Sequence, residues 1–238
     1  MLDYLHRLKD YKKSNPNEIT ASQFEKIEEE LKNPRFGVTS DEVVDFKLWC
    51  MGLPSRQEEF AKYVMKRIPR KDGLKILEVG CGRTARMSRI FAGEGFDVTA
   101  IDPKVEIQDG TIKVIKIRFN HTTFNISDYD FIIAQEPCDA TEHVLRACVK
   151  HKVPFIMSLC GTPHKMISGY MPKDIEEWYD NLLKIADGNA RLRYVSLDPI
   201  TITPMLISNY WARKITVSLK TYCYFLFYIK TSKKFKHK

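Results

Sequence analysis

The stretch Lys75-Ile-Leu-Glu-Val-Gly-Cys-Gly82 decides the fold of this chain. An apolar run of β type ends at Glu78, two glycines follow, and helical apolar spacing begins at Ala85. Glycine has no Cβ, so the backbone can turn tightly and a ligand can approach it closely. In open α/β sheets, ligands bind at the carboxyl ends of the strands, which is where this loop falls. We therefore predict a ligand-binding glycine loop at residues 80–82.

The rest of the chain alternates short apolar runs with helical patterns, which is typical of a parallel sheet covered by helices. The expected strands are Leu74–Val79, Val98–Ile101, Ile112–Ile117, Phe131–Ala134 and Phe155–Leu159, and the expected helices are Ala85–Ala92, Thr141–Lys150 and Pro172–Ala186. Residues 109–130 carry little helical signal, so the crossover there is expected to be reduced. Tyr194–Leu197, Lys214–Leu219 and Tyr222–Ile229 are expected as the last strands, the final two antiparallel about Thr221. The predicted fold class is α/β, with a doubly wound and mostly parallel sheet.

The first seventy residues are predicted to form a helical N-terminal extension. Three capping boxes mark helix starts, at Ser22–Glu25, Thr39–Glu42 and Ser55–Glu58, because the paired side chains satisfy orphan backbone donors. The expected organisation is therefore an extension at residues 1–70, a ligand-binding domain at residues 71–230 and a basic tail at residues 231–238. We expect the extension to cover the ligand bound at the glycine loop.

A carboxylate stands where it can grip a ribose. Asp102 follows Gly82 by 20 residues and ends the next expected strand. A carboxylate there can accept two hydrogen bonds from a ribose diol. Leu77-Glu-Val-Gly-Cys-Gly82 resembles the first motif of class I S-adenosylmethionine-dependent methyltransferases, and Ile101-Asp102 resembles the second.

This resemblance implies a set of cofactor contacts. Asp102 would hold the ribose hydroxyls, and the glycine loop would face the amino-acid moiety of S-adenosylmethionine. The residues implied are Glu78, Gly80, Cys81, Gly82, Asp102, Pro103, Phe119, Asn120 and Gln135, with Phe119 and Asn120 near the adenine. The sequence departs from the family at Thr84, where many members have a third glycine, and this leaves the detailed path of the loop open.

Two alternatives to a methyl-donor site remain. Gly80-x-Gly82-x-x-Ala85 also satisfies the fingerprint of an NAD(P)-binding Rossmann protein. Against it, Glu78 would repel a pyrophosphate but suits a cofactor that carries a sulfonium and an ammonium group. The loop also lies behind helices rather than near the N-terminus. The second alternative is a protein that does not catalyse, either a glycine turn without a ligand or a non-catalytic S-adenosylmethionine-binding protein.

The segment after the fourth expected strand is where this family brings the methyl acceptor to the cofactor. The Asn/Asp-Pro-Pro-aromatic signature of enzymes that methylate exocyclic amines is absent. Pro137-Cys138 and Ser158-Leu-Cys160 resemble the cysteine motifs of cytosine-C5 methyltransferases, but these two cysteines are 22 residues apart, closer than in those enzymes. A group with a His/Pro-Cys-Gly-x-x-Thr-Asp pattern, which includes a tRNA ribose methyltransferase, matches better and departs at Glu136 and Asp139.

The catalytic candidates are therefore Glu136, Cys138 and Asp139. For Asp139 the alternative is structural, because Asp139 and Glu142 also fit a capping box that opens a helix.

Cysteines and histidines give no metal signature by spacing. The six cysteines are scattered, with no Cys-x-x-Cys pair, so thiols are expected rather than disulfides. Cys138, His143, Cys160 and His164 would be the residues to gather around zinc, but their spacings match no common zinc module. No metal is predicted.

The charge distribution leaves the acceptor open between a small molecule and RNA. Of the net +8, the five lysines of residues 230–238 and the +2 of residues 1–13 leave only +1 for residues 14–229. The near-neutral body favours a small molecule, whereas the basic ends and the Pro-Cys resemblance favour RNA. The apolar run Tyr222–Ile229 is too short to span a membrane, and residues 1–13 have no apolar signal core, so a cytoplasmic protein is expected.

Overall fold

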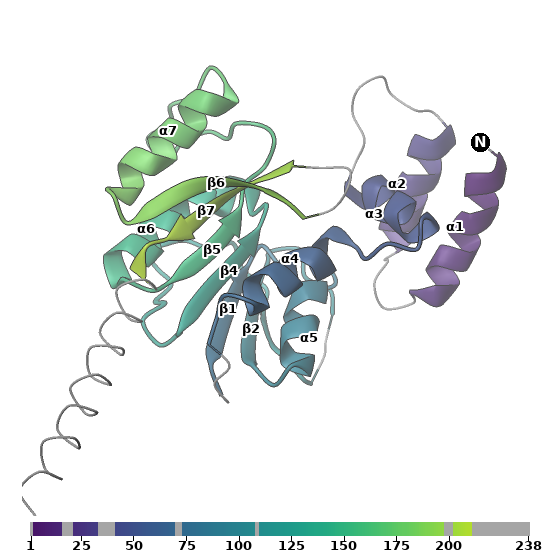
Figure 1. The fold of residues 1–238 in the computed structure, drawn as a ribbon, viewed down its shortest axis with the longest axis horizontal. Coiled ribbons are helices and arrows are strands. Elements are labelled where there is room, and N and C mark those ends of the chain that lie inside the picture. The colour runs from purple at the N-terminus through teal and green to yellow at the C-terminus, as the bar shows by residue number, and fades with distance from the viewer. Residues whose placement is uncertain are drawn as a thin grey trace, which may run out of the picture.

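A seven-stranded sheet organises the protein (Figure 1). The computed structural model describes residues 2–15, 21–32, 41–69, 73–107, 110–197 and 202–210. The strands are β1 (Lys75–Val79), β2 (Asp97–Ile101), β3 (Lys113–Ile115), β4 (Phe131–Gln135), β5 (Phe155–Ser158), β6 (Ala190–Ser196) and β7 (Ile202–Ser208). The helices are α1 (Leu2–Ser14), α2 (Ala21–Lys32), α3 (Asp41–Cys50), α4 (Arg56–Met65), α5 (Arg86–Gly93), the short η1 (Cys138–Ala140), α6 (Thr141–His151) and α7 (Ile175–Ala186).

The strand order is β3-β2-β1-β4-β5-β7-β6, which confirms the doubly wound, mostly parallel sheet. β3, β2, β1, β4 and β5 run parallel, and β7 is antiparallel to both β5 and β6. The chain winds outward from β1 toward β3 and then returns to β4 on the other side. The topological switch point therefore lies between β1 and β4, and ligands bind at such points in open α/β sheets.

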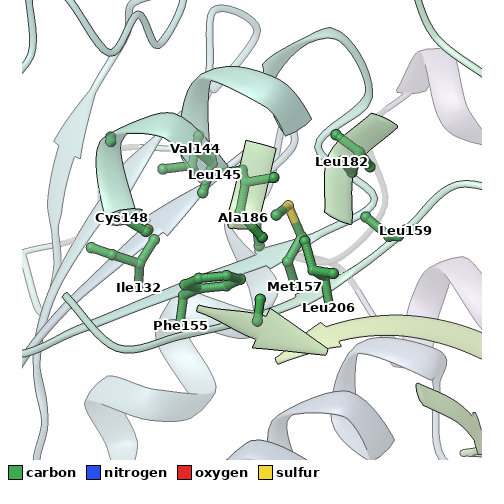
Figure 2. Packing of buried hydrophobic residues seen from close by; sticks show 14 of the residues in the cluster. Ile132, Val144, Leu145, Cys148, Phe155, Met157, Leu159, Leu182, Ala186 and Leu206 are labelled. Carbon is green, nitrogen blue, oxygen red and sulfur yellow. The ribbon is translucent and has the colours of Figure 1, made fainter. Parts of the chain in front are cut away.

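The two faces of the sheet bury different helices. Successive side chains of a strand point to opposite faces, so Leu77 and Val79 pack with α6 and α7, whereas Ile76 packs with α4 and α5. Figure 2 shows the cluster on the α6 and α7 side, where Leu145 and Leu182 meet strand residues. Parallel strands covered on both faces read as continuous apolar runs, which is why β1, β2, β4 and β5 could be predicted.

α4 belongs with the sheet by its packing, and α1–α3 form a small cluster of their own. Phe60, Ala61 and Val64 of α4 are fully buried in the cluster that contains β1 and α5. The separate cluster of α1–α3 is built from Leu8, Tyr11, Ile27, Val43 and Phe46. The three helices stand apart from the sheet in Figure 1, joined to it through α4. Within the described residues, none of the helices has the length and apolar character needed to cross a membrane.

Helix starts agree with the sequence only in part. The Ser55–Glu58 capping box is confirmed, with Ser55 accepting from the backbone of Glu58 and its own N–H bonded to the Glu58 carboxylate. The Ser22 box is wrong, because α2 begins at Ala21 and Ser22 lies inside it. Thr39 lies outside the described residues. α7 begins at Ile175 rather than Pro172, because the Asp174 side chain accepts from the Glu177 N–H and makes Asp174 the N-cap.

The last strands differ most from the expectation. β6 begins at Ala190 rather than Tyr194, and β7, Ile202–Ser208, was not predicted. β7 contains Pro204, and proline has no backbone donor for a strand ladder. β7 accommodates it because the Pro204 carbonyl accepts from the Leu159 N–H at 2.8 Å, just past the end of β5. The predicted strands Lys214–Leu219 and Tyr222–Ile229 and the tail lie outside the described residues.

The connection between β3 and β4 confirms the reduced crossover. β3 spans only Lys113–Ile115, shorter than the expected Ile112–Ile117. No helix lies between residues 116 and 130, all of which the structure describes. Tight turns fill this connection, so the backbone after β3 stays close to the carboxyl edge of the sheet.

Truncating Phe60 tests whether α4 is part of the sheet core. The Phe60 side chain is fully buried in the cluster that contains β1 and α5, so Phe60→Ala should lower the free energy of unfolding by about 3–5 kcal/mol. Lys62→Ala removes only an exposed partner of Glu59 on the same helix and should change it by less than about 1 kcal/mol. Denaturant unfolding measures both variants. Equal, small losses would mean that α4 does not contribute to the core.

Candidate functional site

The glycine loop turns sharply at the carboxyl end of β1. Gly80 and Gly82 have φ values of +79° and +68°, a region that glycine enters without a steric penalty. The Gly80 N–H donates to the Ile101 carbonyl at 2.8 Å, which fastens the loop to the end of β2. A Cβ on Gly80 would lie 3.1 Å from the Pro137 Cα, whereas a Cβ on Gly82 would meet nothing within 4 Å. Gly80 is thus required by packing, and Gly82 faces open space.

Asp102 accepts hydrogen bonds from the loop and can accept more from a ligand. Its Oδ2 accepts from the Gly82 N–H at 3.1 Å, and its Oδ1 accepts from the Lys104 N–H at 2.7 Å. An ionised carboxylate has about four acceptor sites, so roughly two remain for a ligand. The side chain is half-buried and the next residue, Pro103, is exposed. Asp102 is therefore a preorganised acceptor at the point where β1 and β2 end.

Glu78 is buried at the end of β1, just before the loop. The side chain is 2% exposed, and its carboxylate accepts a hydrogen bond from the Ser88 hydroxyl of α5. Burial raises the pKa of Glu78 to about 7, with the neighbouring Asp102 charge adding to the rise. Glu78 therefore ties β1 to α5.

The missing third glycine does not remove the turn. Ala85 takes the left-handed conformation instead, with φ +45°, and serves as the N-cap of α5 without a side-chain hydrogen bond. Left-handed backbone in a residue other than glycine costs about 1–2 kcal/mol and persists only where the surroundings fix it. Cys81, between the two glycines, is buried, and burial raises the pKa of its thiol, so this thiol is held in its neutral form.

The other expected cofactor contacts differ in how much surface they offer. Phe119 is buried and packs against Phe124 with ring centroids 5.6 Å apart. Asn120 is half-buried, and its Oδ1 accepts from the Thr122 N–H at 2.9 Å, which shapes the turn after β3. Gln135 is half-buried at the end of β4 and is paired in register with Ser158. Their roles toward a cofactor stay predictions.

The turn after β4 is the most strained part of the site. Glu136 and Cys138, on either side of Pro137, have φ values of +49° and +52°. The Glu136 N–H donates to the Ser158 carbonyl at 3.1 Å and thereby fixes the turn to β5. Two non-glycine residues in the left-handed region within one turn store strain, and such strain concentrates at functional sites.

Arg56 of α4 reaches this turn from the N-terminal part of the chain. Its Nη1 lies 3.3 Å from the Glu136 Oε1, and its Nε lies 3.6 Å from the Asp45 Oδ1 of α3. Arg86 at the start of α5 pairs with Glu58 of α4 at 3.1 Å. Sequence reasoning missed Arg56, because its partner Glu136 is 80 residues away and no local pattern links them. These ion pairs set α3 and α4 against the site.

Two hollows flank the site. One of about 520 Å³ lies between the N-terminal helices and α5, with Trp49, Ser55 and Arg86 in its lining. The other, of about 620 Å³, lies beside β3 with Val105 and Lys116 in its lining. Neither is lined by the glycine loop or by Asp102. At the loop itself, the open position is that of Gly82, where a Cβ would meet no atom within 4 Å.

The candidates Cys138 and Asp139 meet residues of the loop after β5. The Cys138 Sγ is exposed and lies 3.6 Å from the buried Cys160 Sγ. Asp139 is 73% exposed, with its Oδ1 3.4 Å from the His164 Nδ1 and its Oδ2 3.5 Å from the Arg118 Nη1. Cys138–Ala140 form the short helix η1, and the residue that precedes α6 is Ala140, without a side-chain cap. The capping-box interpretation of Asp139 is therefore wrong.

Glu142 and His143 lie in the first turn of α6 and contact neighbouring segments. The buried Glu142 carboxylate accepts from the Ile167 N–H at 2.7 Å and pairs with Arg146, so it anchors the loop after β5. The His143 Nδ1 lies 2.8 Å from the His121 Nδ1, away from the two cysteines. Burial lowers the pKa of both histidines.

The strand order, the glycine loop after β1 and the acid after β2 are arranged as the resemblance of the sequence to class I methyltransferases implies. No protein-family model matches the sequence, and no curated protein matches it. The structure is similar to a TehB-like SAM-dependent methyltransferase from Corynebacterium glutamicum, at 17% identity over 68% of this chain and 93% of that one, with a TM-score of 0.42.

Two further solved structures are similar at about the same level. One is Haemonchus contortus phosphoethanolamine N-methyltransferase 2, at 14% identity over 62% of this chain and 42% of that one, with a TM-score of 0.45. The other is from a fibrillarin/Nop5p complex, at 15% identity over 64% of this chain and 80% of that one, also with a TM-score of 0.45. Similarity at this level assigns no substrate and no residue role.

Replacing Glu78 by glutamine tests the buried carboxyl. A folded-state pKa of about 7 against an ordinary 4.5 stabilises the fold below about pH 4.5, and this contribution is lost as the pH rises through 7. The stability difference between Glu78→Gln and the natural protein should therefore shift in favour of the variant by up to about 3 kcal/mol between pH 4.5 and 8. Glutamine keeps an acceptor for Ser88.

Denaturant unfolding across this pH range measures the difference, and the exposed Glu94→Gln is the control that should show no such shift. A pH-independent difference for Glu78→Gln would mean that Glu78 is ionised normally in the folded protein.

Proposed function

We propose that this protein is a methyltransferase that uses S-adenosylmethionine. The observation that carries the proposal is the Gly82 N–H bonded to the Asp102 Oδ2 at 3.1 Å, which joins the open glycine loop and the ribose-binding acid into one cradle. Two features fit a nucleoside cofactor: the open space at Gly82, and the acceptor sites of Asp102 that remain for a ribose. The cradle lies at the switch point of the sheet, where ligands of open α/β folds bind.

The electrostatics of the cradle support a cationic cofactor over a pyrophosphate. Glu78 and Asp102 both lie at the loop, and a cation above them favours the ionised form of Glu78. The arginines near the loop are paired with carboxylates, Arg83 with Glu106 and Arg86 with Glu58. A dinucleotide would bring two phosphate charges close to the Glu78 and Asp102 carboxyl groups. The nearby arginines would offset this repulsion little, because each is already paired with a carboxylate. These features favour S-adenosylmethionine over NAD(P).

The chemistry asked of the protein is mostly alignment. S-adenosylmethionine supplies an electrophilic methyl group, and in-line transfer gains its rate chiefly from holding donor and acceptor in line. Asp102 and the open face of the glycine loop at Gly82 would fix the donor. The turn at Glu136–Cys138 would present the acceptor, because it lies against the loop through Pro137. Glu136 is paired with Arg56, so in this role it positions the acceptor rather than removing a proton.

The acceptor is proposed to be a small molecule or RNA. The body of the chain carries only +1, which supports a small molecule, whereas the lysines of residues 230–238 support RNA. Asp139 and Cys138 are exposed at the turn and are the candidates to touch either acceptor. A protein that binds S-adenosylmethionine without turnover is the non-enzymatic alternative, and a methyl-release assay against RNA and cell extract separates it from an enzyme.

Calorimetric titration with Asp102→Ala tests the cradle. The natural protein should bind S-adenosylmethionine and S-adenosylhomocysteine with micromolar affinity and show no binding of NAD or NADP. Asp102→Ala removes charge-assisted hydrogen bonds to the ribose, so affinity should fall at least tenfold, about 1.4 kcal/mol. The matched control is Asp97→Ala, which removes an exposed aspartate at the other end of the same strand and should leave the affinity unchanged.

Circular dichroism of both variants confirms that the fold survives. Unchanged affinity in a folded Asp102→Ala variant would show that Asp102 is not the ribose ligand. Binding of NAD without binding of the methyl donor would overturn the proposed function itself.

Deleting Thr231 to Lys238 tests the nature of the acceptor. The deletion removes four lysines, so under an RNA acceptor it should weaken RNA binding and flatten its dependence on salt, while cofactor binding stays intact. Under a small-molecule acceptor it should leave turnover unchanged. Fluorescence anisotropy with labelled tRNA at several salt concentrations measures the effect. Absence of RNA binding by the full chain at low salt, where attraction is strongest, would exclude the RNA acceptor.

A further inference from the structure

Two cysteines and a histidine come together at the carboxyl edge of the sheet. Cys138 lies in the turn after β4, Cys160 follows β5, and His164 lies four residues further on in the same loop. One ligand atom from each, two sulfurs and a ring nitrogen, lie within 4.8 Å of one another. Of the four residues that the sequence offered for zinc, the structure thus gathers three and places His143 with His121 instead.

The distance between the sulfurs matches a shared metal ion. The Cys138 Sγ and the Cys160 Sγ are 3.6 Å apart. Two thiolates on one tetrahedral zinc, each with a bond of about 2.3 Å, lie about 3.8 Å apart. A disulfide would need the same atoms to approach to about 2.05 Å, and it would leave the adjacent histidine and aspartate without a role. The observed spacing is that of two thiols in hydrogen-bond contact, and it needs little change for both sulfurs to bind one metal ion.

The His164 ring lies between the cysteine pair and an acid. The His164 Nδ1 lies 3.4 Å from the Asp139 Oδ1, whereas its Nε2 is buried and has no hydrogen-bond partner among the described residues. A carboxylate beside one ring nitrogen and a second ring nitrogen without a protein partner are the features of carboxylate–histidine–zinc sites. The ring is also packed against Trp178, with centroids 5.3 Å apart.

Neighbouring strands and one buried hydrogen bond hold the two cysteines side by side. β4 and β5 are parallel neighbours with Gln135 opposite Ser158, so the segments that follow them run side by side. The left-handed turn at Cys138 directs this residue toward Cys160. The Cys160 carbonyl accepts from the buried Tyr179 hydroxyl at 3.1 Å, which fixes the other segment. Ligands held on rigid elements give up little freedom when a metal binds.

We propose that Cys138, Cys160 and His164 bind one Zn²⁺ ion, with water in the fourth position on the exposed side of Cys138. Two sulfurs and one imidazole are a donor set that selects zinc, and three protein ligands with one water are the pattern of an open zinc site. Both thiols bind as thiolates, so uptake of the ion releases their protons to solvent. Asp139 orients the histidine. The site is independent of whether the methyl donor binds.

Metal analysis of the reduced full-length protein tests the proposal. After expression without a histidine tag and gel filtration, elemental mass spectrometry should find about one zinc per chain. Cys138→Ser, Cys160→Ala and His164→Asn should each weaken zinc affinity at least tenfold in competition with a chromophoric chelator. Asp139→Asn should weaken it by about tenfold. Cys50→Ser and Cys148→Ala, one half-buried and one buried cysteine outside the cluster, should retain full affinity.

Cobalt substitution tests directly whether the cysteines bind the metal, because its absorption bands do not arise if the cysteines only stabilise the fold. Co²⁺ added to the metal-free protein should give thiolate-to-cobalt charge-transfer absorption, reduced to about half in folded Cys138→Ser, which keeps one thiolate. Zinc-free reduced protein that shows no such band would overturn the proposal. So would full zinc retention in Cys138→Ser, or a Cys138–Cys160 disulfide in protein that takes up no metal after reduction.

Discussion

The close approach of Gly80 to Pro137 is the constraint on which the site depends. The two residues follow neighbouring strands, β1 and β4, on either side of the switch point. Gly80 favours glycine for two reasons, because its φ is +79° and because a Cβ would lie only 3.1 Å from the Pro137 Cα. The contact brings the loop that would hold a cofactor directly against the turn that would hold its acceptor. Proximity of the two reacting partners is therefore built into the backbone, before any ligand binds.

Strain in the β4 turn follows from the same constraint. With Pro137 fixed against Gly80, the residues on both sides take left-handed conformations and point in different directions. Glu136 meets Arg56 from the N-terminal helices, and Cys138 meets Cys160 after β5. One turn thus connects the glycine loop, the helical extension and the proposed zinc site. A zinc ion there would stabilise the turn from its exposed side, where the fold supplies few buried contacts.

Local features made much of this structure predictable. The strands β1, β2, β4 and β5 are apolar on both faces, and glycines mark the loop after β1, so pattern and turn chemistry agreed. Asp102 could be found because its place after the second strand is fixed by the topology. The tightly turned connection after β3 could also be anticipated, because residues 109–130 lack helical spacing. In each case, the information lies within a short stretch of the chain.

The features that could not be predicted from the sequence depend on contacts between distant segments. β7 was not predicted, and it contains Pro204. This proline is acceptable in the sheet because it lies past the end of β5. Arg56 had no visible partner, since Glu136 is reached only through the folded arrangement. The cysteines and His164 fit no zinc module by spacing, because their ligand atoms come from two adjacent strand ends rather than one compact motif. Asp139 resembled a helix cap, yet its carboxylate faces a histidine instead.

A crystal structure with S-adenosylhomocysteine is the most direct test of the central claim, that the glycine loop and Asp102 form a nucleoside cradle. The account predicts both ribose hydroxyls within about 3 Å of the Asp102 carboxylate. It also predicts the amino-acid end over Gly80 and Gly82 and the thioether facing the turn after β4. A ligand bound elsewhere, or one whose ribose makes no contact with Asp102, would contradict it.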